Sequence, residues 1–187
     1  MTLFDHFGAI APVYDRFFRP HDPARLAELA DLPTPGFLLD VGGGTGRVAH
    51  SLKPWQQSII VADLSFRMLQ NAGCKDGLHT VCAPAERLPF ADESFDRIIM
   101  VDALHHVCSQ TTAVDEMWRL LRPGGKIVIE EPDIRSVFVV ILALLEKILL
   151  MRSHFLSPPK IVALFPPSGL KQQIVVKGYT AWIIIEK

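Results

Sequence analysis

The glycine pattern of residues 38–46 constrains the fold of this chain more than any other feature of the sequence. An apolar run ends at Asp40, and glycine then occupies every second position, at Gly42, Gly44 and Gly46. Such a run predicts a buried strand that enters a tight turn, because glycine permits positive φ and lets a ligand approach the backbone closely. In an α/β protein a nucleotide-type ligand binds at this place, beyond the carboxyl end of the first strand.

The spacing of the glycines separates the known types of binding loop. A dinucleotide-binding loop, G-x-G-x-x-G from Gly42, needs a glycine where this chain has Arg47. A phosphate-binding loop needs Gly-Lys-Ser/Thr, where this chain has Gly46-Arg47-Val48. What remains is an acid followed by G-x-G-x-G. The alternative interpretation is a glycine-rich turn that binds no ligand.

Apolar runs alternate with helical stretches along the chain. Strands are expected over residues 37–41, 58–62, 77–82, 95–101, 126–130, 173–176 and 180–186, and helices over 3–32, 45–52, 65–72 and 112–121. This alternation predicts βαβ units, and the short connection between the last two strands makes them antiparallel neighbours. We therefore expect a doubly wound, Rossmann-like α/β sandwich of three layers, with a seven-stranded sheet whose last strand is antiparallel.

The length of 187 residues predicts a single domain over residues 1–187. Within it we expect four parts: a helical cap over 1–32, a ligand-binding core over 37–131, an apolar helical segment over 132–170 and a hairpin over 171–187.

Charge and cysteine content exclude several classes of protein. The net charge is −1 and no basic stripe indicates a nucleic-acid partner. Cys74, Cys82 and Cys108 lack metal-ligand spacing, so we expect small buried thiols, no metal ion and a cytoplasmic protein. The first residues do not show a basic region followed by an apolar core, so no signal peptide is predicted.

Several segments resemble the class I S-adenosyl-L-methionine (SAM) dependent methyltransferases. The acid-x-G-x-G-x-G loop has the form of the first motif of that family. The segment Ala83–Phe90 resembles the family's Asp-Ala-Glu-x-Leu-Pro-Phe segment, with Pro84 in place of the aspartate. Ala103–His106 resembles an Ala-Leu-His-His segment, and Leu120–Lys126 resembles the turn before the fifth strand.

A second resemblance narrows the group. Phe4-Asp5 and Ala11–Asp15 resemble the opening helix of the quinone-biosynthesis C-methyltransferases, and the last residues fit the closing hairpin of that family. In that group a Tyr-Asp pair closes over the cofactor, which implies this role for Tyr14.

The cofactor-binding residues follow from position and from the resemblance. Asp63 ends the second strand, where an acid can accept hydrogen bonds from both ribose hydroxyls; a helix cap before Ser65 is the alternative. In the family the aspartate at the position of Pro84 meets the adenine amine and the next backbone N–H, here of Ala85, meets a ring nitrogen. The set is Tyr14, Asp40, Gly42, Gly43, Gly44, Gly46, Asp63, Leu64, Ala85, Glu86 and Asp102.

His105 and His106 are the candidate catalytic residues, since an imidazole of near-neutral pKa can act as a general base or polar anchor. A structural, hydrogen-bonded role is the alternative. Adjacent histidines do not form the helical metal pair, which needs a spacing of four.

The segment Val137–Leu145 is unbroken apolar sequence, and Glu146-Lys147 and Ile148–Met151 follow it. It is shorter than the roughly 20 apolar residues of a membrane span. A helix that is apolar all round packs in a core or lies against a partner, a lipid or a greasy substrate.

The sequence thus implies methyl transfer from SAM, with S-adenosyl-L-homocysteine as product, to a small or lipophilic and quinone-like acceptor. The sulfonium is already activated, so the protein needs mainly in-line positioning and exclusion of water. One alternative is a SAM-binding or partner-regulating protein without catalysis, and a less favoured one is an NAD-linked oxidoreductase. Peripheral contact with a membrane and the oligomeric state stay open.

Overall fold

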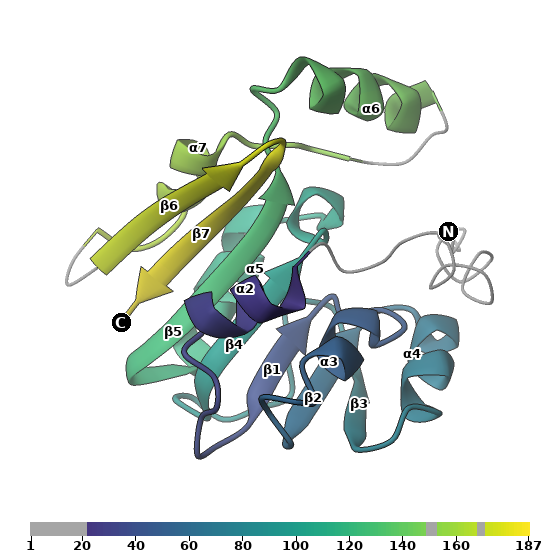
Figure 1. Ribbon diagram of the computed structural model, residues 1–187, viewed down its shortest axis with the longest axis vertical. Coiled ribbons are helices and arrows are strands. Elements are labelled where there is room, and N and C mark those ends of the chain that lie inside the picture. The colour runs from purple at the N-terminus through teal and green to yellow at the C-terminus, as the bar shows by residue number, and fades with distance from the viewer. Residues whose placement is uncertain (1–21, 149–152, 168–170) are drawn as a thin grey trace.

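A mostly parallel β-sheet organises the molecule (Figure 1). The computed structural model describes residues 22–148, 153–167 and 171–187. The strands are β1 (Leu38–Val41), β2 (Ile59–Asp63), β3 (Leu78–Cys82), β4 (Phe95–Val101), β5 (Leu121–Pro132), β6 (Lys171–Lys177) and β7 (Thr180–Glu186). Their order is β3-β2-β1-β4-β5-β7-β6, and β7 runs antiparallel to both of its neighbours. The predicted seven-stranded fold with an antiparallel last strand is confirmed.

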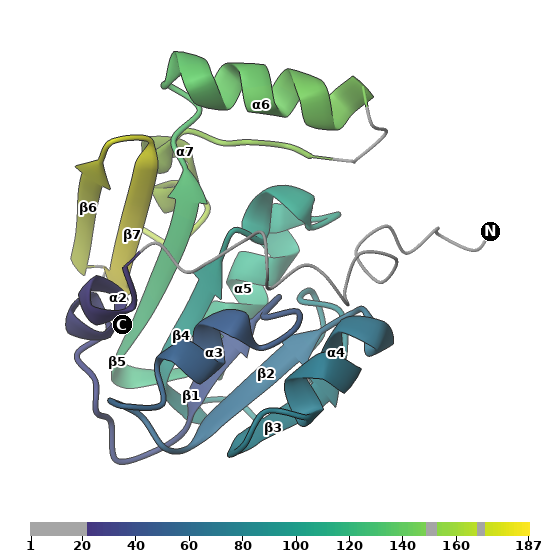
Figure 2. The same ribbon diagram turned by 45° about the vertical axis from the view of Figure 1, so that its right-hand side comes forward.

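Helices cover both faces of the sheet (Figure 2). They are α2 (Pro23–Leu29), α3 (Arg47–Ser51), α4 (Phe66–Gly73), the 3₁₀ turn η1 (Leu104–His106), α5 (Gln110–Leu120), α6 (Val137–Ile148) and α7 (Pro158–Val162). Neighbouring strand residues alternate between the faces. Leu38 and Ile99 pack with α2, α3 and α4, whereas Leu39 and Ile98 pack with α5 and α7. The result is the three-layer arrangement that the sequence predicts.

Polar side chains begin three of these helices by accepting hydrogen bonds from backbone N–H groups that lack a helical partner. The Asp22 carboxylate accepts from the Arg25 N–H at 3.0 Å. The Ser65 hydroxyl accepts from the N–H of Met68 at 3.4 Å, which confirms the cap expected there. Ser109 does the same at the start of α5.

The boundaries of several elements differ from the predicted ones. Helix α3 begins only at Arg47, because Gly46 before it keeps a left-handed φ of +69°. Helix α5 begins at Gln110, directly after its Ser109 cap. Strand β5 begins five residues before the predicted Lys126, because Leu121 already pairs with Phe95 ahead of a register shift. Of the helix predicted over 3–32, residues 1–21 lie outside the described part of the chain.

The prediction of buried cysteines is wrong. Cys74, Cys82 and Cys108 are all exposed. Cys82 ends β3, which is an edge strand, and Cys74 and Cys108 lie just outside helices α4 and α5. None of these positions is covered by a second layer, so the apolar character of the thiol does not determine its burial.

The sheet topology determines where a ligand can bind. From β1 the chain moves outward through β2 to β3, and it then returns to β4 on the other side of β1. The connections after β1 and β4 therefore diverge and leave a crevice at the carboxyl ends of these two strands. The glycine loop follows β1 and η1 follows β4, so both border this edge (Figure 2).

Candidate cofactor-binding and active site

The glycine loop after β1 adopts the backbone that its sequence predicts. Gly42, Gly44 and Gly46 have φ values of +70°, +53° and +69°, in the left-handed region that side chains disfavour. The Gly42 N–H donates to the Ala62 carbonyl at 2.7 Å, and the Gly44 N–H donates to Asp63 Oδ2 at 2.8 Å. These bonds hold the loop against the end of β2.

The two sides of the loop differ in the space they leave. A Cβ on Gly42 would lie 2.7 Å from the Cβ of Ala103, so the loop packs tightly beneath the end of β4. Among the described residues, a Cβ on Gly44 would meet nothing closer than Met68 Cε at 3.4 Å. Room therefore exists at Gly44 for a ligand that a larger side chain would displace.

Asp63 joins the loop to α4. Its Oδ2 accepts from the Gly44 N–H, and its Oδ1 accepts from the Ser65 N–H at 2.7 Å. Asp63 therefore has the capping role that the sequence offers as an alternative. A carboxylate has about four acceptor positions, so capping and acceptance from ribose hydroxyls are compatible roles for this residue. Leu64 beside it is 68% exposed.

Asp40 is buried directly beneath the loop, with 1% of its surface exposed. Within the described part of the chain neither of its oxygens makes a hydrogen bond. Burial raises the pKa of this carboxyl to about 7, against the opposing effect of Arg47 and with a further increase from Asp63. The nearby Ala49 N–H has the smallest effect and lowers the pKa, although it makes no hydrogen bond to either carboxyl oxygen. A buried carboxyl that accepts no hydrogen bond destabilises the ligand-free protein. A bound cationic ligand, or a water that it orders, would supply the missing partner.

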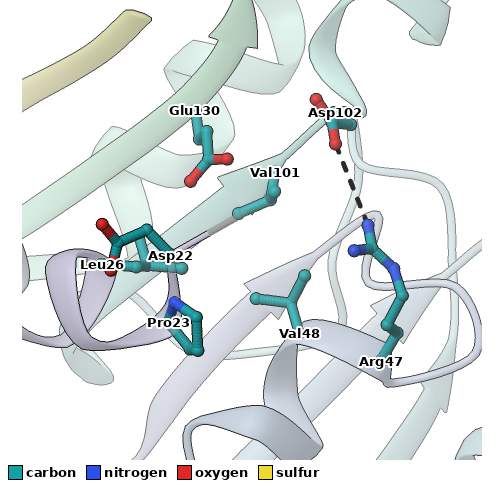
Figure 3. A pocket seen from close by; sticks show the side chains of 8 residues that line it. All are labelled: Asp22, Pro23, Leu26, Arg47, Val48, Val101, Asp102 and Glu130. Carbon is teal, nitrogen blue, oxygen red and sulfur yellow. Dashed lines mark ion pairs between the residues drawn. The ribbon is translucent and has the colours of Figure 1, made fainter. Parts of the chain in front are cut away.

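Three further charged side chains gather where β4 and β5 end (Figure 3). Asp102 has a left-handed φ of +51°, and its N–H donates to the Glu130 carbonyl at 2.9 Å. Its carboxylate lies 3.8 Å from the guanidinium of Arg47. Glu130 is buried and accepts from the indole N–H of Trp182 at 2.8 Å. Burial, followed by the charge of Asp102, raises the pKa of Glu130 to about 7.

His105 and Glu131 form a buried pair. His105 Nδ1 lies 2.5 Å from Glu131 Oε2, and the other oxygen of Glu131 accepts from the N–H groups of Ala103 and Leu104 at 3.0 and 2.8 Å. One carboxylate thus fixes both the start of η1 and the orientation of the imidazole. In the neutral ring this contact places the proton on Nδ1 and the lone pair on Nε2.

His106 differs from His105 in its electrostatics. Burial and the neighbouring charge of His105 lower the pKa of His106 to about 3. Its Nδ1 lies 3.3 Å from the hydroxyl of Ser153. A group with so low a pKa is a weak base near neutrality, which disfavours His106 as the general base.

The connection after α6 returns to cover η1. The His154 N–H donates to the His105 carbonyl at 2.7 Å, and the Phe155 ring stacks on the His105 ring with centroids 4.2 Å apart. Gln110 ties the same segment to η1 by donating to the carbonyls of Leu104 and His154. Part of the segment 132–170 therefore forms a wall of the site.

The loop after β3 lies on the other side of the glycine loop. The Ala83 N–H donates to the Asp63 carbonyl at 3.0 Å, which brings this loop next to Asp63. Within the described chain the Ala85 N–H makes no hydrogen bond. Glu86 accepts from the Ser109 N–H at 3.1 Å and so joins this loop to the start of α5.

The structure therefore brings the loop glycines, Asp40, Asp63, Leu64, Ala85, Glu86, Asp102 and the two histidines to one edge of the sheet. Tyr14 lies outside the described residues. The sequence interpretation assigned no site role to Arg47, Glu130 or Glu131. The two adjacent acids at the end of an apolar strand were a usable signal, because that edge of the sheet carries the ligand site.

Comparison with known proteins decides between the ligand classes. Residues 39–129 match a protein family described as "Methyltransferase domain". The chain is also 27% identical to a crystallised SAM-dependent methyltransferase, possible histamine N-methyltransferase, of Thermotoga maritima, over 97% of both chains and with a TM-score of 0.78. Residues 39–129 carry a methyltransferase domain. The family uses SAM as its cofactor.

Two further relatives show how much of the chain resembles known methyltransferases. The ubiquinone/menaquinone biosynthesis C-methyltransferase UbiE of Coxiella burnetii is 34% identical over 104 residues, which are 50% of this chain and 42% of the relative. The present chain thus spans less than half the length of that relative. A SAM-dependent methyltransferase of Aquifex aeolicus shares the fold over 98% of both chains with a TM-score of 0.72, at 16% identity.

The residues present fit SAM. This ligand carries a positive sulfonium and a positive ammonium group, and Asp40, Asp63, Asp102 and Glu130 give the edge of the methyltransferase site an acidic character. The unbonded carboxyl of Asp40 and the room above Gly44 are the two features that a bound cofactor would explain.

Proposed function

We propose that the protein transfers the methyl group of SAM to a small, lipophilic acceptor. The observation that carries this proposal is the loop of left-handed glycines above a buried carboxyl that lacks a donor. The domain match supports the class of reaction. The apolar helix α6 and the names of the UbiE relatives favour an acceptor of low polarity.

The proposed cofactor contacts follow the geometry of the edge. Gly42, Gly43, Gly44 and Gly46 would face the methionine part of SAM, with Asp40 ordering the loop from beneath. Asp63 would accept from the ribose hydroxyls, while Leu64 and the Ala85 N–H would meet the adenine. Glu86, Asp102 and Tyr14 complete the proposed set.

When bound, SAM supplies an electrophilic methyl group that needs no further activation. The residues of the chain would orient the acceptor and exclude water at the edge formed by η1 and the segment around Phe155. His105 would accept a proton through Nε2 if the acceptor must lose one, as a ring carbon or hydroxyl does. Glu131 is then a positioning residue, since it holds the proton of the neutral imidazole on Nδ1.

A second candidate function is binding of SAM without catalysis. It rests on Pro84, where the family's side-chain acceptor for adenine is missing, and the comparisons do not favour it. The Glu86 carboxylate, which could take over that contact, is already bonded to the Ser109 N–H.

A methyl-transfer assay with isotopically labelled SAM tests the proposal. The acceptor panel contains hydroquinones with prenyl or alkyl tails of increasing length, and histamine as the polar alternative suggested by the Thermotoga relative. We expect transfer to the hydroquinones, with affinity rising about fourfold for each buried methylene, from about 0.8 kcal/mol per group. Transfer to histamine alone would contradict the lipophilic acceptor, and SAM binding without transfer to any acceptor would favour the binding protein.

A further inference from the structure

Helix α6 carries apolar side chains that stay exposed in the described part of the chain. Its side chains Val137, Phe138, Val140, Ile141 and Leu144 are between 42% and 76% exposed. At about 100° per residue these five side chains fall on one side of the helix, and the buried Val139 lies on the opposite side. The described part of this exposed stripe contains no polar side chain.

The helix stands apart from the sheet. In Figures 1 and 2, α6 lies beyond the carboxyl end of β5, outside the two layers of helices that cover the sheet. Neither hydrophobic core cluster includes a side chain of α6 that the structure describes. The interpretation of this segment as a core helix is therefore not supported by its described side chains.

We propose that α6 docks on the surface of a lipid bilayer, with the exposed stripe inserted at the boundary between headgroups and acyl chains. A helix of this length extends about 18 Å, against a hydrocarbon core of about 30 Å. Among the described residues no helix is both long and apolar enough to cross a membrane. An apolar helix that cannot span a bilayer can still lie in its interface.

The size and shape of the stripe favour a bilayer over a second copy of the chain. Five side chains of one protruding helix expose a few hundred Å². A stable protein interface needs about 800 Å² on each partner, usually on surfaces of complementary shape. A bilayer has no such requirement, because it deforms around a convex apolar ridge.

The residues beside the stripe suit an interface. The Phe138 ring contacts the Tyr179 ring, with centroids 5.3 Å apart, and Tyr179 lies at the turn between β6 and β7. Aromatic rings with one polar edge prefer the headgroup region. Among the described cations near the stripe, Arg135 pairs with Asp133 at 2.7 Å and Lys177 with Asp22 at 3.7 Å. Binding should therefore depend on apolar insertion and respond little to lipid charge.

Docking through α6 would also deliver a lipid-dissolved acceptor. The chain that leaves α6 returns at Ser153 and lies against η1, where Phe155 stacks on His105. The segment that follows the docked helix in the chain thus forms a wall of the proposed active site. This consequence rests on the proposed function, whereas docking itself does not.

Co-sedimentation with vesicles tests the proposal directly. The full chain is mixed with vesicles of phosphatidylcholine, and with vesicles of equal parts phosphatidylcholine and phosphatidylglycerol. We expect it to sediment with both to within a few-fold. The double variant Ile141→Glu/Leu144→Glu should lose at least about tenfold in vesicle affinity, since two exposed apolar anchors become charged. Phe66→Glu is the matched control, because Phe66 is equally exposed on another helix and should not alter binding.

Circular dichroism and SAM calorimetry on each variant check folding and separate docking from the proposed function. Should the double variant fold poorly, Val137→Glu in the first turn of α6 replaces it. Wild-type protein that stays in the supernatant, or equal sedimentation of wild type and a folded α6 variant, would overturn the proposal. Self-association without lipid that the α6 variant abolishes would assign the stripe to a second copy instead. Loss of SAM binding with intact sedimentation would count against the proposed function alone.

Discussion

Replacing the buried Asp40 by asparagine should change how the stability of the ligand-free protein depends on pH. In the folded protein the Asp40 carboxyl has a pKa of about 7, raised from 3.8 mainly by burial. The folded state therefore holds this proton where the unfolded state has released it. The free energy of unfolding should fall as pH rises from about 4 to 7, because deprotonation favours the unfolded chain.

The size of the effect follows from the shift. Each pKa unit is worth about 1.4 kcal/mol, so a shift of about 3 units costs about 4 kcal/mol once the pH exceeds 7. About 2.5 kcal/mol of this cost develops between pH 5 and pH 8. Asparagine cannot ionise and should remove that part of the slope, although its buried amide adds a penalty of about 1–3 kcal/mol that does not vary with pH.

Urea unfolding at pH 5 and pH 8 measures the slope in wild type and Asp40→Asn. Glu130→Gln is the matched comparison, because the pKa of Glu130 is also raised to about 7 and a separate part of the slope should disappear with it. The reasoning is refuted if Asp40→Asn loses stability between pH 5 and pH 8 as steeply as wild type does.

Three other substitutions have defined outcomes. Asp63→Ala removes the acceptor for the Gly44 N–H and the proposed acceptor for the ribose hydroxyls. It should weaken SAM binding by about 1.5–3 kcal/mol for each charge-assisted bond to the ribose that is lost. Unchanged affinity in calorimetry would leave only the capping role. Pro84→Asp restores the family's adenine acceptor and should tighten SAM binding by about 0.5–1.5 kcal/mol, provided that thermal unfolding shows an intact fold; no gain would mean that another residue already reads the adenine amine. Glu131→Gln should move the proton of the neutral His105 ring from Nδ1 to Nε2, as the amide can donate to Nδ1; an unchanged tautomer in ¹⁵N NMR would contradict the positioning role.

The sheet could be predicted because its signals are local. Apolar runs such as 95–101 mark buried parallel strands, and the short turn at Gly178 joins β6 and β7 in the only direction it allows. The start of β5 could not be predicted. Leu121 belongs to the strand through its pairing with Phe95, a contact distant in sequence that precedes Pro123 and the glycines of the turn.

The site was predictable where backbone conformation defines it. The left-handed loop glycines and the acid at Asp63 are specified by residue type and position. The Glu131–His105 pair was not, because it joins the ends of two strands and depends on burial that the sequence does not display. The environment of α6 shows the same limit, since apolar sequence alone does not distinguish a core helix from an exposed one.

Calorimetric titration of SAM into wild type and Gly44→Val tests the central claim most directly. Among the described atoms a Cβ at Gly44 meets none closer than 3.4 Å, so valine should fold there at the cost of some backbone strain while filling the space assigned to the cofactor. Gly124→Val is the control for that strain, because Gly124 also has a left-handed φ, its Cβ would meet no described atom within 4 Å, and it lies near the start of β5, at the end of that strand away from the site. We expect one SAM per chain for wild type and Gly124→Val, and no measurable binding for a folded Gly44→Val. Absence of SAM binding by wild type, or equal affinity in Gly44→Val, would contradict it.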